Sequence, residues 1–289
     1  MKYTSLHTHT LFCDGTDDVE TMCRAAWEKG LAAVGFSAHG PIRRKTGLHT
    51  NWHLPEERLE EYAAEVRAAR KRWEGKIAVY LGLEMDYIKG RIGPADQDIQ
   101  ELGLDFIIAS VHYIDPPGKG GLFSVDGSMR ELERGVREGF AGDGEAMMEC
   151  YWNAVGDMIA AGGFDILGHA DLIKKNNPDR RWFNPEGETY RRKSRETVRA
   201  AGKAALVVEV NTGGLNRRKT PDTYPSVPLL RLFRENGVPA VITADAHRAQ
   251  DLDGFYQTAR QTLLAAGYTT HALFDGRKDK RPQWTFADL

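Results

Sequence analysis

The sequence predicts an α/β fold in which short strands alternate with amphipathic helices around a parallel sheet. Seven short apolar runs are separated by longer segments, where apolar residues recur at three- and four-residue spacing among Lys, Arg and Glu. Such an alternation forms either an open doubly wound sheet or a closed barrel. No glycine-rich phosphate loop follows the first run, and the 289 residues suit one barrel of roughly 250 residues. We therefore favour a barrel of seven or eight units, in one domain that covers residues 1–289.

The boundaries of the predicted elements follow from these runs and from the residues that flank them. Asp17 and Asp18 precede the first predicted helix, Gly30 follows it, and Pro55 opens the second. The segment 115–127 is rich in Gly and Pro and is predicted to be a long loop. The predicted strands are 3–6, 32–36, 77–83, 106–111, 164–167, 205–210 and 238–243, and the predicted helices are 17–29, 55–73, 146–161, 186–201 and 228–236.

Charge and cysteine content limit the classes of partner and compartment. The 39 Lys and Arg residues against 41 Asp and Glu give a net charge of −2, so no overall field attracts nucleic acid or an anionic membrane. No apolar run approaches the roughly 18 residues of a membrane span. The 3 cysteines have neither paired nor Cys-x-x-Cys spacing, which argues against disulfides and thiolate zinc. We expect a cytoplasmic protein that acts on a small molecule.

The first and last predicted strands each end in a pair of metal-ligand residue types. His7 and His9 are separated by one residue, and Asp245 and His247 have the same spacing. In an extended segment, side chains two residues apart point the same way, so each pair can hold one ion. A single pair of this kind is often a surface accident. Two such pairs at two strand ends predict a metal site.

The ends of the other predicted strands carry further imidazoles and carboxylates. The carboxyl ends of all barrel strands open onto one face, so these side chains are expected to converge there. Of the 9 histidines, His49, His53 and His271 lie away from the strand ends. The candidate ligands are His7, His9, Asp14, His39, Glu84, His112, His169, Asp245 and His247.

This ligand set exceeds what one ion can take. A catalytic ion has roughly four protein ligands or fewer, so we predict two or three divalent ions, with Glu84 in a position to bridge. Imidazole and carboxylate without thiolate suit zinc, manganese or iron.

Clustered metal ions usually serve hydrolysis, and phosphate esters profit most, because the ions activate water and neutralise charge on the leaving oxygen. Four basic residues follow the fifth and sixth predicted strands as candidate phosphate-binding groups: Lys174, Lys175, Arg217 and Arg218. Gly213 and Gly214 precede the arginines and allow a tight turn or a close approach to a ligand. Asn51, Trp52 and His53 either shape the substrate pocket or pack as an ordinary loop.

The motifs at the strand ends resemble those of the PHP (polymerase and histidinol phosphatase) superfamily, in order and spacing along nearly the whole chain. Residues 80–87, 164–175 and 209–212 resemble its histidinol-phosphate phosphatase branch. The motifs are His7-Thr8-His9 with Asp14, Ser37-Ala38-His39, Gly82-Leu83-Glu84, Ser110-Val111-His112, Gly168-His169 and Asp245-Ala246-His247.

The resemblance implies a distorted seven-stranded TIM-like (β/α) barrel of the PHP fold. It also implies a trinuclear metal centre and the release of phosphate from L-histidinol phosphate in histidine biosynthesis. Lys174 or Lys175 stands where an arginine is more usual in the family. By the family pattern, one ion is held by His7, His9, Glu84 and Asp245, a second by Glu84, His112 and His169, and a third by Asp14, His39 and His247.

The mechanism we expect is in-line attack on phosphorus by a hydroxide shared between two ions, with Arg217 or Arg218 on the phosphoryl oxygens. Asp245 or His247 handles the proton. Two alternatives stay open at this point. One is another PHP-type phosphoesterase that acts on a nucleotide or a cyclic phosphodiester, because fold does not fix substrate. The other is a non-catalytic, metal-binding regulatory module. The sequence does not predict an oligomeric state.

Overall fold

A computed structural model describes residues 2–42, 46–117 and 121–289, and its centre is a mostly parallel sheet. Within the described residues, the sheet has 9 strands in the order β1-β2-β3-β4-β7-β8-β9-β10-β11. The first seven of these are parallel and follow the sequence order, which confirms the predicted α/β fold. They are β1 (Thr4–Ser5), β2 (Ala33–His39), β3 (Ala78–Asp86), β4 (Phe106–Ser110), β7 (Ile166–Leu167), β8 (Val207–Asn211) and β9 (Ala240–Thr243).

The two ends of this seven-strand order meet at their carboxyl ends. Thr8, just beyond β1, forms a parallel bridge with Ala246, just beyond β9. The His9 amide donates to the Ala246 carbonyl at 2.8 Å, and the Ala246 amide donates to the His7 carbonyl at 3.0 Å. These bonds bring the first and last predicted ligand pairs next to each other.

The two faces of the strands bury separate apolar clusters. In β4, Ile107 and Ala109 belong to the large cluster that the helices share, whereas Phe106 and Ile108 belong to a smaller cluster on the other face. A Cβ at Gly82 would lie 2.5 Å from the Phe106 ring, so glycine makes room for that ring. The smaller cluster contains Leu6, Phe106, Ile108, Ile166, Val207, Val241, Ala272 and Phe274.

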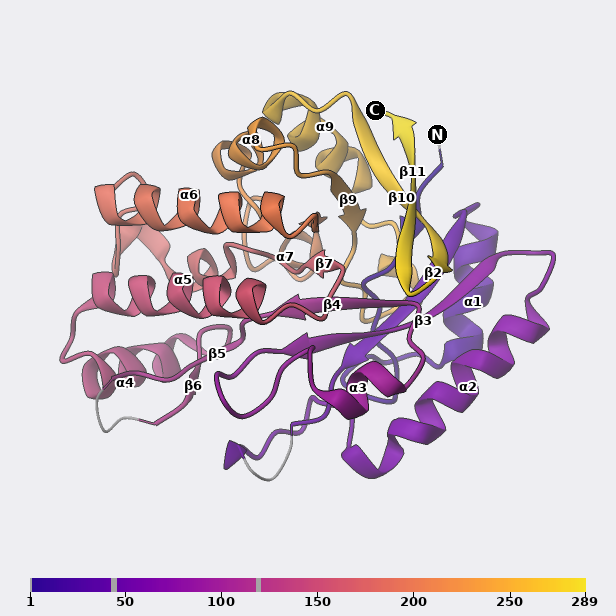
Figure 1. Ribbon diagram of the computed structural model, residues 1–289, viewed down its shortest axis with the longest axis horizontal. Coiled ribbons are helices and arrows are strands. Elements are labelled where there is room, and N and C mark those ends of the chain that lie inside the picture. The colour runs from indigo at the N-terminus through magenta and orange to yellow at the C-terminus, as the bar shows by residue number, and fades with distance from the viewer. Residues whose placement is uncertain (1, 43–45, 118–120) are drawn as a thin grey trace.

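The five predicted helical segments are helical, and the helices surround the strands (Figure 1). Asp18 caps the first helix by accepting the Thr21 amide at 2.7 Å. Helices α5 and α6 lie side by side, as do α8 and α9. The predicted helices correspond to α1 (Val19–Glu28), η2 (Glu56–Arg58) with α2 (Leu59–Arg72), α5 (Gly144–Ala161), α6 (Glu188–Lys203) and α8 (Val227–Glu235).

Several further elements were not predicted from the sequence. The C-terminal hairpin of β10 (Thr270–Lys278) and β11 (Arg281–Asp288) extends the sheet from β9. Among the described residues, no helix is long and apolar enough to cross a membrane. The remaining helical elements are α3 (Gln97–Glu101), α4 (Met129–Gly139), η3 (Leu172–Asn176), η4 (Pro178–Arg180), α7 (Gly213–Asn216), η5 (Ala249–Asp251) and α9 (Tyr256–Ala266).

The predicted loop 115–127 is partly wrong. Residues 118–120 lie outside the described residues, but β6 (Phe123–Ser124) pairs antiparallel with β5 (Tyr113–Ile114). Tyr113 and Ile114 are buried, whereas Phe123 and Ser124 are only half-buried. In the sequence, the surrounding Gly and Pro residues favoured a loop over a strand at the apolar residues of this hairpin.

Candidate metal centre

The carboxyl ends of the parallel strands bring all nine predicted ligands into one region. His39 and Glu84 are register partners in β2 and β3. The others follow β1, β4, β7 and β9, and the side chains of His7 and His9 are fully buried. Asp14 and His247 lie at the open side, where the Asp14 side chain is 31% exposed.

Glu84 lies at the centre of the site. Its Oε2 atom is 2.8 Å from His39 Nδ1, 3.1 Å from His7 Nε2 and 3.7 Å from His9 Nε2. Its Oε1 atom is 2.9 Å from His169 Nε2 and 3.6 Å from His112 Nε2. The two oxygens thus face different imidazoles, as a bridging carboxylate requires.

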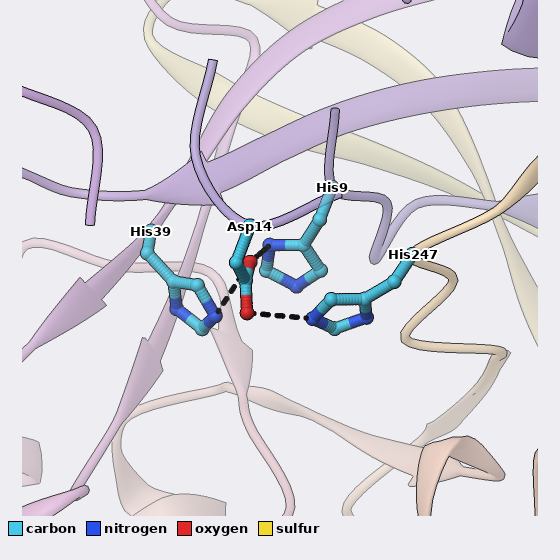
Figure 2. A group of neighbouring side chains, drawn as sticks. All are labelled: His9, Asp14, His39 and His247. Atoms are coloured by element: carbon cyan, nitrogen blue, oxygen red, sulfur yellow. Dashed lines mark hydrogen bonds and ion pairs between the residues drawn. The ribbon is translucent and has the colours of Figure 1, made fainter. Parts of the chain in front are cut away.

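Asp14 joins a second group of imidazoles, shown in Figure 2. Its Oδ2 atom is 3.1 Å from His247 Nε2, and Oδ1 is 3.7 Å from His39 Nε2 and 3.8 Å from His9 Nδ1. The His9 ring is stacked against the rings of both His39 and His247, with centroid distances of 4.2 and 4.3 Å.

Several buried atoms at the site make no hydrogen bond to any described residue. They include His7 Nε2, His9 Nε2 and His39 Nδ1, and also Glu84 Oε2, from which the three nitrogens lie 2.8 to 3.7 Å away. Buried polar atoms are rarely left in this state, so they fit ligands of metal ions. Four overlapping groups place their ligand atoms within 4.8 Å of one another: His9, Asp14, His39 and His247; His7, Glu84 and His169; His7, His9 and Asp245; and His39, Glu84 and His112.

These groups differ in part from those that the family resemblance implies. Asp14, His39 and His247 stay together, and His9 joins them. Glu84 is shared between groups, as expected, but His39 also lies close to Glu84 and His112.

The charges in the site favour the metal-binding forms of its carboxylates. Burial opposes the ionisation of Glu84, yet the imidazoles of His7 and His39 hold its pKa well below the usual range. Burial and the neighbouring imidazoles lower the pKa of His9 to about 3. Burial alone would also lower the pKa of His7, but Glu209 and Glu84 raise it well above its usual value. A metal ion at His7 would therefore displace a proton.

Two buried carboxylates behind the ligands were missed by the sequence analysis. Glu209 Oε2 is 2.8 Å from His7 Nδ1, and Glu209 Oε1 accepts the His169 amide at 2.6 Å. Asp86 Oδ1 is 3.0 Å from His112 Nδ1. Carboxylates in these positions fix the tautomer and direction of a ligating imidazole. Their signal in the sequence is an acidic residue within or directly after a buried apolar run.

Among the four predicted phosphate-binding residues, Arg217 alone lines the cavity beside the ligands, within the part of the chain that the structure describes. Its Nη2 atom donates to Asp245 Oδ2 at 2.8 Å, and Nη1 donates to Oδ1 at 3.2 Å. The Arg217 side chain is 35% exposed, so burial disfavours its charge only in part, and Asp245 raises its pKa above the usual value. Arg217 is therefore a cation at the edge of the ligand cluster.

The other three predicted phosphate-binding residues lie elsewhere. Arg218 is exposed and has a φ of 54°. Lys174 Nζ donates to the Thr223 carbonyl at 2.6 Å and pairs with Asp171, and Lys175 pairs with Asp126. A strand-end position alone does not reveal such local partners, which occupy the ammonium group of each lysine.

The cavity has a volume of about 630 Å³ and extends from the ligands to an apolar wall. Seven predicted ligands line it, together with Asn51 and Trp52. His53 lies behind Trp52, with ring centroids 3.7 Å apart. The segment 51–53 thus shapes the cavity, which is one of the two roles considered for it.

Fold and site together define an α/β protein with a metal-binding site at the carboxyl ends of parallel strands. The chain belongs to the PHP domain family, because the model of that family, described as "PHP domain", matches residues 5–213. This confirms the resemblance seen in the sequence motifs.

Relatives with similar sequences cover nearly the whole chain. A Deinococcus radiodurans protein named "Probable histidinol-phosphatase" is 30% identical over 265 residues, which are 91% of this chain and 94% of that protein. The Bacillus subtilis "Histidinol-phosphatase" is 25% identical, over 87% of this chain and 96% of that protein.

A solved structure shares the fold. The crystal structure of Lactococcus lactis histidinol phosphate phosphatase, complexed with zinc, L-histidinol and phosphate, matches with a TM-score of 0.69 and 22% identity. The match covers 98% of this chain and 99% of that chain.

Proposed function

We propose that this protein is a histidinol-phosphatase, which hydrolyses L-histidinol phosphate to L-histidinol and phosphate in histidine biosynthesis. The observation that carries the proposal is Glu84, which faces five imidazoles at the floor of a cavity that Arg217 also lines. The names of the two sequence relatives support the choice of substrate.

The cofactors in this proposal are two or three divalent ions of zinc, manganese or iron, in the trinuclear arrangement that the family implies. His7, His9, Glu84 and Asp245 would hold one ion. Glu84, His112 and His169 would hold a second, and Asp14, His39 and His247 a third. Bound ions would supply positive charge for the phosphoryl oxygens and lower the pKa of water. Zinc in the Lactococcus lactis structure belongs to that protein, and the donor atoms here suit the same ion.

Arg217 would bind the phosphoryl oxygens. It lies between the ligand cluster and the cavity, and its planar group can take two oxygens at once. In the described contacts, it is held toward the site by Asp245. A positive electrostatic potential around the site would be the only contribution of Arg218, Lys174 and Lys175.

Asp245 and His247 are the candidates for proton transfer. Both line the cavity, and His247 Nδ1 is 3.0 Å from the Asp245 carbonyl and 3.6 Å from Oδ1. One of the two would return a proton to the leaving alkoxide, because a positioned acid lowers the cost of expelling that group.

The proposal also places residues 1–289 in one domain and the enzyme in the cytoplasm. The 3 cysteines, Cys13, Cys23 and Cys150, are free, which suits a reducing compartment.

Substrate preference separates this proposal from its rivals. We expect kcat/KM for L-histidinol phosphate to exceed that for a nucleoside monophosphate and for a cyclic phosphodiester by about 100-fold or more, because binding energy at the leaving group adds to a common phosphate site. A preference for either alternative ester would assign the chain to another PHP-type activity. Bound metal without hydrolysis of any of the three would indicate the regulatory module.

A further inference from the structure

The cavity has an apolar wall beside the ligands that phosphate binding does not explain. Leu48, Trp52, Tyr113, Leu122 and Phe123 line this end. Most of these residues pack on a small cluster that is separate from the main core and is centred on Ile88 and Ile92. An enzyme that recognised phosphate alone would need no such wall.

Trp52 is the part of this wall that lies nearest the ligands. Its ring is edge-on to His39, with centroids 4.6 Å apart, and edge-on to His112 at 5.4 Å. Tyr113 lies nearly parallel to it at 5.9 Å, with an interplanar angle of 16°. Trp52 is half-buried and lines the cavity, so part of its ring faces the space beside the ligand cluster.

The segment that carries Trp52 is anchored to the metal site itself. His53 Nε2 is 2.8 Å from Asp86 Oδ2, and His53 Nδ1 is 2.7 Å from Thr50 Oγ1. The other oxygen of Asp86 accepts from the His112 amide at 3.2 Å and lies 3.0 Å from His112 Nδ1. One buried carboxylate therefore holds both a metal-ligand imidazole and the loop behind Trp52.

We propose that Trp52 contacts the leaving group of the substrate and selects phosphate esters of alcohols that carry a planar ring. In this proposal, His53 is a positioning residue, which packs on Trp52 and is itself held by Asp86. The proposal rests on the proposed phosphatase function and adds a specificity determinant to it. With the phosphoryl group at the ligands and Arg217, a short alcohol chain brings its ring to the apolar end of the same cavity.

The test compares Trp52→Ala with the wild-type enzyme on two ring-bearing esters, L-histidinol phosphate and phenyl phosphate, and on glycerol 2-phosphate, which has no ring. Loss of one stacking contact is expected to lower kcat/KM for ring-bearing esters about 10-fold, mainly through KM, and to leave glycerol 2-phosphate unchanged. Trp52→Phe keeps a flat ring and should retain most of the preference. Trp27→Ala, at a half-exposed tryptophan outside the cavity, is the matched control.

Binding measurements extend the test beyond turnover. Calorimetry with L-histidinol and with inorganic phosphate, each alone, should show that Trp52→Ala weakens only the first. His53→Phe keeps a ring but removes both hydrogen bonds, so it should weaken L-histidinol binding and shift the emission of Trp52. Equal losses for all three esters, or unchanged L-histidinol binding, would overturn the proposal. Phenyl phosphate also separates the two proposals, because ring selection on that ester can hold even if L-histidinol phosphate is not a substrate.

Discussion

Asp245 has a backbone conformation that few non-glycine residues adopt, with a φ of 49°. The next residue, Ala246, is fixed by two backbone hydrogen bonds to the segment 7–9. The Asp245 side chain contacts His9 at 3.3 Å and Arg217 at 2.8 Å. Bonds on both sides therefore maintain a strained residue at the point where ligands from the two ends of the chain meet.

Arg217 and Arg218 are neighbours in the chain and therefore give a matched pair of variants. Arg217→Met is expected to lower kcat/KM for L-histidinol phosphate about 100-fold, because a charged donor to the phosphoryl oxygens is lost. Arg218→Met removes the same charge from an exposed position and should change kcat/KM less than about two-fold. Steady-state kinetics on both variants checks this. A larger effect at Arg218 would mean that the phosphate site was assigned to the wrong residue.

The short element α7 controls the position of Asp245. A Cβ added at Gly213, the first residue of α7, would lie 2.5 Å from Asp245 Oδ2 and 2.7 Å from its Cβ. The glycine pair was predicted from the sequence to allow either a tight turn or a close approach to a ligand. The structure shows that Gly213 instead allows the close approach of a site carboxylate, which spacing alone does not reveal.

Gly213→Ala should therefore displace Asp245 without unfolding the protein. We expect kcat/KM to fall about 10- to 100-fold, because small displacements of a reacting group are costly. The control is Gly156→Ala in α5, where an added Cβ meets open space. Kinetics and thermal unfolding on both variants test this. If Gly213→Ala is as active as Gly156→Ala, α7 does not determine the position of the carboxylate.

For the molecule as a whole, the sequence predicted the features that follow from the order of the strands: the parallel sheet and the ligands that meet at its carboxyl ends. His7 and Asp245 are far apart in the chain, but parallel strands with sequential order bring their carboxyl ends together. Glu209 and Asp86 were missed because a strand pattern does not tell which acid contacts which imidazole. The ion pairs of Lys174 and Lys175 were not foreseen for the same reason, since Asp171 and Asp126 are partners that only the folded chain brings near. No strand was predicted after residue 243, so the β10–β11 hairpin is an addition that the structure makes.

The central claim is that Glu84 joins the ligands of several strands into one metal site. Elemental analysis of the purified wild-type chain and of Glu84→Gln tests it most directly. We predict two or three divalent ions per wild-type chain and a loss of more than one ion per chain in the variant, because both Glu84 oxygens face imidazoles of different groups. A wild-type chain without bound metal, or a variant with full metal content, would contradict this account.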